Sequence, residues 1–273
     1  MITIHNNTPI EEVHIPGSFR TIHVKREDLC CGGPAFSKMR GVAAHLSNRP
    51  ETFIGVLDTF HSKAGWGVSY LLEDMDKKAV VFYPVYKGDK GLRYPQFQAS
   101  LCGARIVGID AGRSCILYHK ARKMLAEYSP DSYLLPNGLK CPETVAETAR
   151  EVYAVPDTFM ENTTWVISMS SGTVAAGVIR GLIERRANVE IYLHMGYSRS
   201  LRGAHLYISE MVGSPLPVSV KFVDEKYEYK QGIKYECPFP CNPFYDLKAW
   251  RWLMNNHNNI NHKNKIMFWN IGA

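Results

Sequence analysis

The feature that most constrains the fold is an alternation of short apolar, β-branched runs with longer amphipathic stretches. The runs have the length of strands, and the stretches between them repeat apolar residues at helical spacing. Expected strands cover residues 21–24, 52–57, 79–84, 104–109, 164–168, 189–194, 218–223 and 265–269. Expected helices cover residues 38–46, 65–75, 94–101, 114–127, 142–153, 173–185, 200–211 and 246–255. Buried strands that alternate with helices predict an α/β architecture with mostly parallel, twisted sheets and crossover connections.

The composition is that of a folded globular protein. Of the 273 residues, 45% are apolar and 21% are charged, enough to bury a substantial core in one or two domains. No apolar run reaches the roughly 20 residues that a bilayer span needs. The N-terminal segment is polar and acidic and resembles neither a secretory nor a transit signal. We therefore expect a cytoplasmic protein without a membrane partner.

The seven cysteines are scattered and odd in number, which predicts reduced thiols in place of a disulfide framework. Cys237 and Cys241 flank Pro-Phe-Pro, but a single C-x3-C pair lacks a second pair of ligands, so we expect no metal site. The net charge of +6 is compatible with an anionic partner, such as a phosphate-bearing cofactor or nucleic acid. No basic run is dense enough to require nucleic acid.

The first segment with chemical content surrounds Lys38. An expected strand ends in Lys-Arg-Glu-Asp-Leu (residues 25–29), a Gly-Gly-Pro loop follows, and a helix is expected to begin near Ser37. Ser37 is a candidate N-cap, which places Lys38 in the first turn. The positive field at a helix N-terminus disfavours a protonated amine, so it favours the neutral lysine that Schiff-base chemistry needs.

The second segment runs from an apolar strand through Ser170, Ser171, Gly172 and Thr173 into a helix. Backbone N–H groups at such a helix start, with hydroxyl groups beside them, form an anion site. The segment lacks both G-x-G-x-x-G and G-K-[ST], so it predicts neither a dinucleotide fingerprint nor a Walker loop. Its alternative interpretation is a tightly packed turn with no ligand.

Together the two segments resemble the fold-type II enzymes that depend on pyridoxal 5'-phosphate (PLP). This group contains threonine dehydratase, the tryptophan synthase β chain and aminocyclopropane-carboxylate deaminase. Residues 135–138 (Leu-Pro-Asn-Gly), 242–249 and 266–273 resemble further family segments in the right order. The resemblance implies two three-layer α/β domains. The smaller would cover residues 45–135, and the larger would combine residues 1–44 and 136–273. It also implies a homodimer.

The resemblance implies a role for several residues. Lys38 would carry PLP as a Schiff base and move protons. The turn of Ser170, Ser171, Gly172 and Thr173 would hold the cofactor phosphate, with backbone amides from Val174 and from Ala175 or Ala176. The family often places a Ser or Thr beside the pyridine nitrogen, where this chain has Ile271; Asn270 would then take its place. Most relatives continue beyond the position of Ala273, so the shorter ending would open the cleft.

The chain departs from the family at its substrate loop. The family usually carries a Ser/Thr-x-Gly-Asn-His segment that clamps the substrate carboxylate, whereas residues 58–69 here lack the Gly-Asn pair. His61, Ser62 and Lys63 become candidate substrate contacts, or they form an altered structural loop. Tyr197 and Tyr245 are candidate acid–base or stacking groups, although such tyrosines commonly serve as core or rim aromatics.

The resemblance leaves three functions open. The first is a PLP-dependent lyase that acts on an amino acid through an external aldimine, with loss of ammonia or a β-substituent. The second is a PLP-dependent decarboxylase of an amino-acid group attached to a larger anionic carrier. Short, divergent enzymes of that kind occur in bacteriophage pathways that hypermodify thymine in DNA, which would place this chain in the host cytoplasm. The third is an inactive binding module, which the presence of both Lys38 and the Ser170 turn disfavours.

Overall fold

The chain is described by a computed structural model that covers residues 2–15, 20–34, 36–88, 91–261 and 264–272. The chain divides into two compact units. The large unit consists of Ile4–Gly41 and Pro142–Ala273, and the small unit of Met1–Thr3 and Val42–Cys141. The sequence analysis placed the limits of the smaller domain at residues 45 and 135. Ala273, at which it placed the shortened ending, lies outside the described residues.

The large unit is built on a six-stranded sheet with the order β1-β2-β10-β7-β8-β9. Its strands are β1 (Ile10–His14), β2 (Thr21–Arg26), β7 (Glu161–Met169), β8 (Asn188–Met195), β9 (Val220–Val223) and β10 (Lys265–Asn270). Only β1 pairs antiparallel with its neighbour among these strands, and the other pairs are parallel. The carboxyl ends of β2, β10, β7 and β8 therefore lie at one edge of the sheet.

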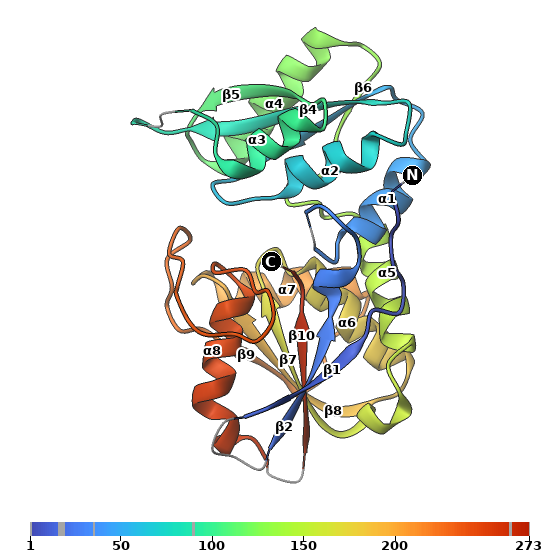
Figure 1. The fold of residues 1–273 in the computed structure, drawn as a ribbon, viewed down its shortest axis with the longest axis vertical. Helices are drawn as coiled ribbons and strands as arrows, with labels where there is room; N and C mark the ends of the chain where they lie inside the picture. The colour runs from blue at the N-terminus through green and yellow to red at the C-terminus, as the bar shows by residue number, and fades with distance from the viewer. Residues whose placement is uncertain (1, 16–19, 35, 89–90, 262–263, 273) are drawn as a thin grey trace. The chain divides into compact units, whose positions relative to one another are not determined.

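Helices cover both faces of this sheet and give the large unit three layers (Figure 1). The helices are α5 (Pro142–Tyr153), α6 (Thr173–Glu184), α7 (Leu201–Val212) and α8 (Asp246–Asn256). Trp165 and Ile167 of β7 pack with α5, α6 and α7, whereas Val166 between them packs with α8. This alternation follows from the two-residue period of a strand and explains the continuous apolar run of β7, which is buried on both faces.

The small unit has a four-stranded parallel sheet with the order β5-β4-β3-β6. Its elements are β3 (Phe53–Leu57), β4 (Lys78–Val85), β5 (Arg105–Asp110), β6 (Ser132–Leu134), α2 (Ala64–Leu72), α3 (Tyr94–Leu101) and α4 (Ser114–Tyr128). Val80 and Phe82 pack with α4, whereas Val81 lies against Gly65 of α2. The small unit therefore also has three layers, and the expected α/β class with mostly parallel sheets is confirmed for both units.

Each expected strand and helix overlaps an element of the described structure. Two strands were missed: β1 has an acidic, largely solvated sequence (Ile-Glu-Glu-Val-His), and β6 has only three residues. The remaining elements are the short 3-10 helices Glu27–Leu29, Asp157–Phe159 and His257–Asn259 and the helix α1 (Met39–Ser47). Across the described residues, none of the helices is long and apolar enough to cross a bilayer.

The start of α1 differs from its prediction. The helix begins at Met39, so Lys38 immediately precedes the first turn. The Ser37 hydroxyl is buried and has no hydrogen-bond partner among the described residues, so the predicted N-cap role of Ser37 is wrong. The backbone explains the placement, because Ser37 N donates to Ile271 O at 2.9 Å and the loop is thereby tied to the end of β10.

The small residues of α6 allow a close helix–helix contact. A Cβ atom on Gly177 would lie 2.5 Å from Thr148 Cβ and 2.8 Å from Val145 O, both on α5. Gly177 therefore packs α6 against its neighbouring helix α5.

Candidate active site

Four loops at the carboxyl edge of the large sheet carry most of the predicted site residues. The loop after β2 leads to Lys38, the loop after β7 carries Ser170 and Ser171, the loop after β8 carries Tyr197, and β10 ends at Asn270. Ligands of open α/β sheets bind at this edge, because several loops meet there and helix N-termini point toward it.

Lys38 and the predicted anion loop are in direct contact. Lys38 Nζ donates a hydrogen bond of 2.9 Å to Ser171 Oγ, although 133 residues separate the two in the chain. Ser171 Oγ in turn lies 3.2 Å from Thr173 Oγ1. Both Lys38 and Ser171 are half-buried, so the amine is held beside the hydroxyl groups and remains accessible to a ligand. The structure therefore brings the two sequence motifs into one place.

The helix start after this loop has the geometry of an anion site. Gly172 is the N-cap of α6 with φ = 91°, a conformation that L-residues with a side chain rarely adopt. The first three N–H groups of a helix have no acceptor within the helix, and here they belong to Thr173, Val174 and Ala175. Ala176 N already donates to Gly172 O at 2.9 Å, so Ala175 and not Ala176 can offer its amide to a ligand.

A buried carboxyl group that the sequence analysis missed connects the two loops. Asp246, at the start of α8, accepts hydrogen bonds from Ser168 Oγ at 2.6 Å and from Ile271 N at 3.2 Å. Burial raises the pKa of this carboxyl group to about 7. Since Ile271 O accepts from the Lys38 loop, Asp246 links the ends of β7 and β10 to that loop. In the sequence it is only an acidic residue directly after Tyr245, at the start of the expected helix of residues 246–255.

The charged Lys-Arg-Glu-Asp segment of residues 25–28 takes part in buried ion pairs beside the loop that carries Lys38. Lys25 Nζ lies 3.0 Å from Glu151 Oε2, and Arg40 Nη1 lies 2.6 Å from Glu27 Oε2; all four side chains are buried. Buried charges are costly unless they are paired and hydrogen-bonded. Arg40 is two residues from Lys38, so this pairing fixes the backbone that carries the lysine.

Asn270 is fully buried at the end of β10. Its Nδ2 donates to Asp28 Oδ1 and to Pro240 O, each at 2.9 Å, and Cys241 Sγ lies 3.6 Å from its Oδ1. Both N–H groups of the amide are thus used within the protein. The role of Asn270 beside the pyridine nitrogen stays a prediction. In the structure its side chain holds the end of β10 through these hydrogen bonds.

Tyrosines line the same edge. The Tyr245 hydroxyl is hydrogen-bonded to the side chains of Ser170 and Tyr229, and burial holds its pKa well above the ordinary value. The rings of Tyr197 and Tyr229 meet edge to face, with centroids 5.0 Å apart. The predicted Tyr197 and Tyr245 are therefore brought together through Tyr229. Tyr229 was not identified from the sequence, where it lies in the segment Lys-Tyr-Glu-Tyr-Lys of residues 226–230.

Tyr207 of α7 was also missed. Its hydroxyl lies 3.4 Å from Thr173 Oγ1, and its ring would be 3.3 Å from a Cβ atom on Gly172. Tyr207 therefore covers the anion loop. Its position two turns into an amphipathic helix gave no sequence signal, because the same pattern describes an ordinary surface tyrosine.

His61, Ser62 and Lys63 belong to the small unit, in the loop between β3 and α2. Ser62 Oγ accepts from Ala64 N at 3.0 Å, and Lys63 Nζ lies 5.7 Å from the ring centroid of Trp66. Burial lowers the pKa of the Lys63 amine. The His61 ring meets Phe60 edge to face, with centroids 6.2 Å apart. Ser62 thus binds the amide of Ala64, the first residue of α2, while the substrate roles of all three residues stay predictions.

Asp58, in the same loop, is a second buried carboxyl group. It accepts from Gly65 N and from Gln96 Nε2, each at 2.7 Å. Burial raises its pKa to about 6. The carboxylate fixes the turn between β3 and α2, so this loop is organised by its own hydrogen bonds.

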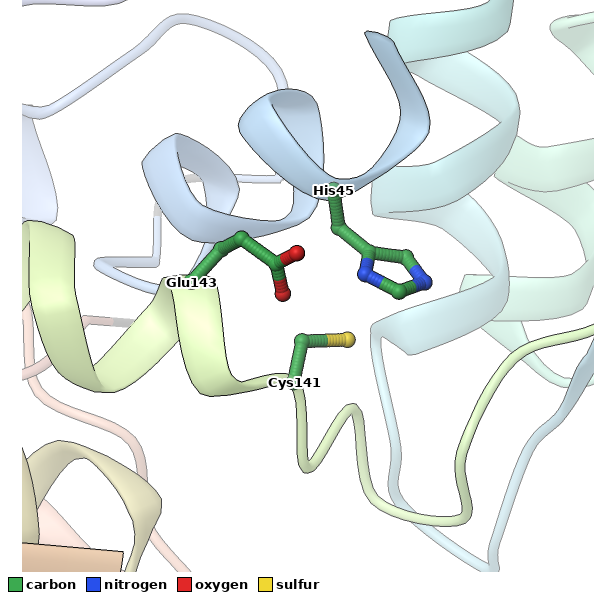
Figure 2. A group of neighbouring side chains, drawn as sticks. All are labelled: His45, Cys141 and Glu143. Atoms are coloured by element: carbon green, nitrogen blue, oxygen red, sulfur yellow. The ribbon is translucent and has the colours of Figure 1, made fainter. Parts of the chain in front are cut away.

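The described cysteines are free thiols. Cys237 and Cys241 place their sulfur atoms 3.5 Å apart. In the small unit, Figure 2 shows His45 of α1 and Cys141, whose candidate ligand atoms lie within 4.8 Å of each other. His45 Nε2 also lies 3.0 Å from Tyr133 Oη. Glu143, the third residue labelled in Figure 2, belongs to the large unit. A structural zinc site takes four ligands, so the two residues of the small unit support no metal assignment.

Comparison with known proteins decides the family. The chain is 50% identical, over 278 aligned residues, to the "Glycyl-dTMP PLP-dependent decarboxylase" of Pseudomonas phage M6, and the alignment covers 98% of this chain and 99% of the relative. The chain belongs to the fold-type II PLP-dependent enzymes. No family model matches it, so the assignment to these enzymes rests on the relative and on the fold.

Solved structures of fold-type II enzymes share the fold at low sequence identity. An ACC deaminase homologue superposes with a TM-score of 0.82 at 18% identity, covering 99% of this chain and 90% of that one. The O-acetylserine-dependent cystathionine β-synthase of Helicobacter pylori gives 0.68 at 17%, covering 99% and 94%. A threonine deaminase of T.th. gives 0.68 at 12%, covering 98% and 92%. These likenesses show the fold alone.

Proposed function

We propose that this chain binds PLP on Lys38 and removes the carboxylate, as CO2, from a glycyl group attached to a thymine nucleotide. The observation that carries the proposal is the 50% identity, over the whole chain, to a relative named for this activity. Of the two enzymatic functions that the sequence left open, this is the decarboxylase. The coarser statement, a PLP-dependent lyase, covers both.

The residues at the carboxyl edge of the large sheet fit PLP. The N–H groups of Thr173, Val174 and Ala175 have no acceptor within α6, and Ser171 and Thr173 add hydroxyl groups, a donor set suited to a phosphate. Lys38 Nζ lies within hydrogen-bond distance of the same loop. A side chain at Gly172 would enter the space beside Tyr207. An amine and a phosphate cradle on one edge meet the two main requirements of the cofactor.

The chain's own residues have distinct tasks in this reaction. Bound PLP supplies an electron sink for the pair left when the bond to the carboxylate breaks. Lys38 Nζ holds the cofactor between turnovers and delivers a proton to the carbon that has lost its carboxylate. Ser171 orients the amine by accepting its hydrogen bond, and Tyr245, hydrogen-bonded to Ser170, fixes the adjoining turn.

The substrate loop suits loss of a carboxylate. A carboxylate that is held by strong hydrogen bonds is stabilised in the ground state, which opposes its departure. In residues 58–69 the Gly-Asn pair of the family's carboxylate clamp is absent. Asp58 and Ser62 instead accept hydrogen bonds from backbone N–H groups at the start of α2.

We propose in addition that the chain forms the homodimer expected for the family.

The test combines cofactor trapping with a product assay. Purified protein should show a visible PLP band, and borohydride reduction followed by peptide mapping should place the adduct on Lys38. Incubation with glycyl-modified thymidine monophosphate should release CO2. The Lys38→Ala variant should lose both the borohydride-trapped adduct and the release of CO2. Lys87→Ala, which removes an exposed lysine of the small unit, should keep both.

Each outcome selects one function. Release of ammonia from free amino acids, without CO2 from the glycyl substrate, would replace the decarboxylase by the lyase that loses ammonia or a β-substituent. A protein that stays colourless with added PLP would contradict the cofactor assignment and favour a binding module.

A further inference from the structure

We propose that Arg199 binds a phosphate group of the substrate and thereby selects a nucleotide over an unphosphorylated nucleoside. The inference rests on the proposed function and deepens it, because it assigns a residue to the carrier of the glycyl group. The phosphate has two sources, a mononucleotide or the phosphodiester backbone of DNA, and both present the same anionic oxygens.

A continuous series of contacts connects Arg199 with the catalytic lysine. Lys38 Nζ donates to Ser171 Oγ, and the preceding residue, Ser170, is hydrogen-bonded to Tyr245. Tyr245 is hydrogen-bonded to Tyr229. All these residues belong to the large unit, so the series runs along one edge of one sheet.

The series ends in a guanidinium group stacked on a tyrosine. The Tyr229 ring meets the Tyr197 ring edge to face at 5.0 Å, and Arg199 Cζ lies 5.6 Å from the centroid of Tyr197. Aromatic faces and edges of this kind suit a pyrimidine ring, which stacks on tyrosine without regard to its substituents. A substrate whose glycyl end reaches Lys38 would therefore direct its nucleotide portion along these tyrosines.

Arg199 has donor capacity that the described chain does not use. Its Nη2 atom is buried and has no hydrogen-bond partner among the described residues. Asp224 accepts a hydrogen bond from Ser198, the residue before Arg199, at 2.9 Å and pairs with Lys226 Nζ at 2.8 Å, so these contacts already engage its carboxylate. A buried, unsatisfied N–H of a charged group is costly, so an acceptor is expected there when the site is filled.

The chemistry favours phosphate as that acceptor. Arginine presents a planar fork of donors that matches phosphate oxygens. The substrate's other anion, the glycyl carboxylate, has to leave as CO2, and an arginine bound to it would stabilise the ground state and slow the reaction. Arg199 is therefore assigned to the carrier, and the reacting carboxylate lies at the Lys38 end of the series.

The experiment measures binding to the PLP-loaded enzyme, in which the cofactor already fills the phosphate cradle of α6. Calorimetric titrations compare thymidine monophosphate, thymidine and a short thymidine oligonucleotide. The unaltered enzyme should prefer the monophosphate to thymidine, and Arg199→Ala should remove about 10- to 100-fold of that preference, the range for charge-assisted hydrogen bonds. Arg199→Lys should restore part of it, since it returns the charge without the fork.

Arg202→Ala is the matched control, because Arg202 is exposed on the first turn of α7 and carries the same charge. The Arg202→Ala enzyme should prefer the monophosphate to thymidine as strongly as the unaltered enzyme does. The visible PLP band and the unfolding temperature verify that each variant is folded. A loss confined to the oligonucleotide would identify the DNA backbone as the source of the phosphate.

Three results overturn the inference. The first is an Arg199→Ala enzyme that keeps its full preference for both the monophosphate and the oligonucleotide over thymidine, and the second is an Arg202→Ala enzyme that loses as much preference as Arg199→Ala. The third is an unaltered enzyme that binds thymidine as tightly as it binds the monophosphate and the oligonucleotide. The proposed function is judged separately by CO2 release. Decarboxylation without phosphate preference removes only the role of Arg199, and phosphate preference through Arg199 without CO2 removes only the proposed reaction.

Discussion

Replacement of Gly172 by alanine should separate the cost of backbone strain from the loss of a phosphate site. Gly172 has φ = 91° at the N-cap of α6, and holding an L-residue there costs about 1–2 kcal/mol. The new Cβ atom would lie 3.2 Å from Ile208 Cγ1 and 3.3 Å from the Tyr207 ring, closer than comfortable packing allows. We therefore expect the turn to shift, and with it the amides of Thr173 and Val174.

Gly213 provides the matched control. It caps the C-terminus of α7 with φ = 83°, and a Cβ atom there would meet nothing within 4 Å. Gly213→Ala should cost the same strain, about 1–2 kcal/mol, without touching the anion loop. Gly172→Ala should thus lower the free energy of unfolding of the PLP-free protein, measured by urea titration, at least as much as Gly213→Ala does.

The two variants should differ in PLP affinity. Loss or misalignment of one charge-assisted hydrogen bond to a phosphate corresponds to about 10- to 100-fold in affinity. Gly172→Ala should show at least that loss in a spectrophotometric PLP titration, and Gly213→Ala should bind as the unaltered protein does. If Gly172→Ala binds PLP normally while it is destabilised like the control, the assignment of the phosphate to this loop is refuted.

Two further predictions concern stability. Burial raises the pKa of Asp58 from 3.8 to about 6. The protonated Asp58 therefore contributes about 3 kcal/mol to the free energy of unfolding. This contribution is fully present below about pH 4 and is lost as the pH rises through about 6. Asp58→Asn should abolish that part of the pH dependence of urea unfolding, because the Gln96 amide can rotate and accept a hydrogen bond from the new amide. An unchanged pH profile would contradict the ionisation of a buried Asp58. Gly177→Ala should destabilise by about 1–3 kcal/mol, since its Cβ atom would lie 2.5 Å from Thr148 Cβ. Gly203→Ala lies in the first turn of α7, where a Cβ atom would come no closer than 3.5 Å to Ser200. It should be neutral or stabilising by up to about 1 kcal/mol. Equal effects of the two variants in thermal unfolding would argue against the tight contact of α5 and α6.

Much of the fold was predictable because strands and helices leave different apolar periods in the sequence. The strand β7 is one example: its unbroken apolar run requires burial on both faces, and helices cover both. The strand β1 is the counterexample. The Glu-Glu pair of β1 is exposed on an edge strand. The position of β1 is decided by its pairing with β2, a contact that no local sequence pattern predicts.

The site was predictable in part. Lys38 and the Ser170 turn were found as separate motifs, and both lie at the carboxyl edge of the large sheet, where we propose that PLP binds. Asp246, Tyr207, Tyr229 and Arg199 were not identified, because a single acidic, aromatic or basic residue beside a loop has no distinguishing spacing. Asn270 was chosen from its place in the chain, whereas its hydrogen bonds to Asp28 and Pro240 depend on segments distant in sequence.

The sequence by itself determined which segments become strands and helices, that the sheets are mostly parallel, and which lysine and which turn resemble the family's motifs. The strands and helices follow from local spacing, since a period of two or of 3.6 residues shows which face of an element is apolar. The lysine and the turn were identified by their resemblance to the family. Only the tertiary structure decided which polar groups share the edge of the sheet. Crossover connections bring Lys38 and Ser171 within 2.9 Å across 133 residues, and the same folding leaves Arg199 with an unused buried donor at the far end of the tyrosines.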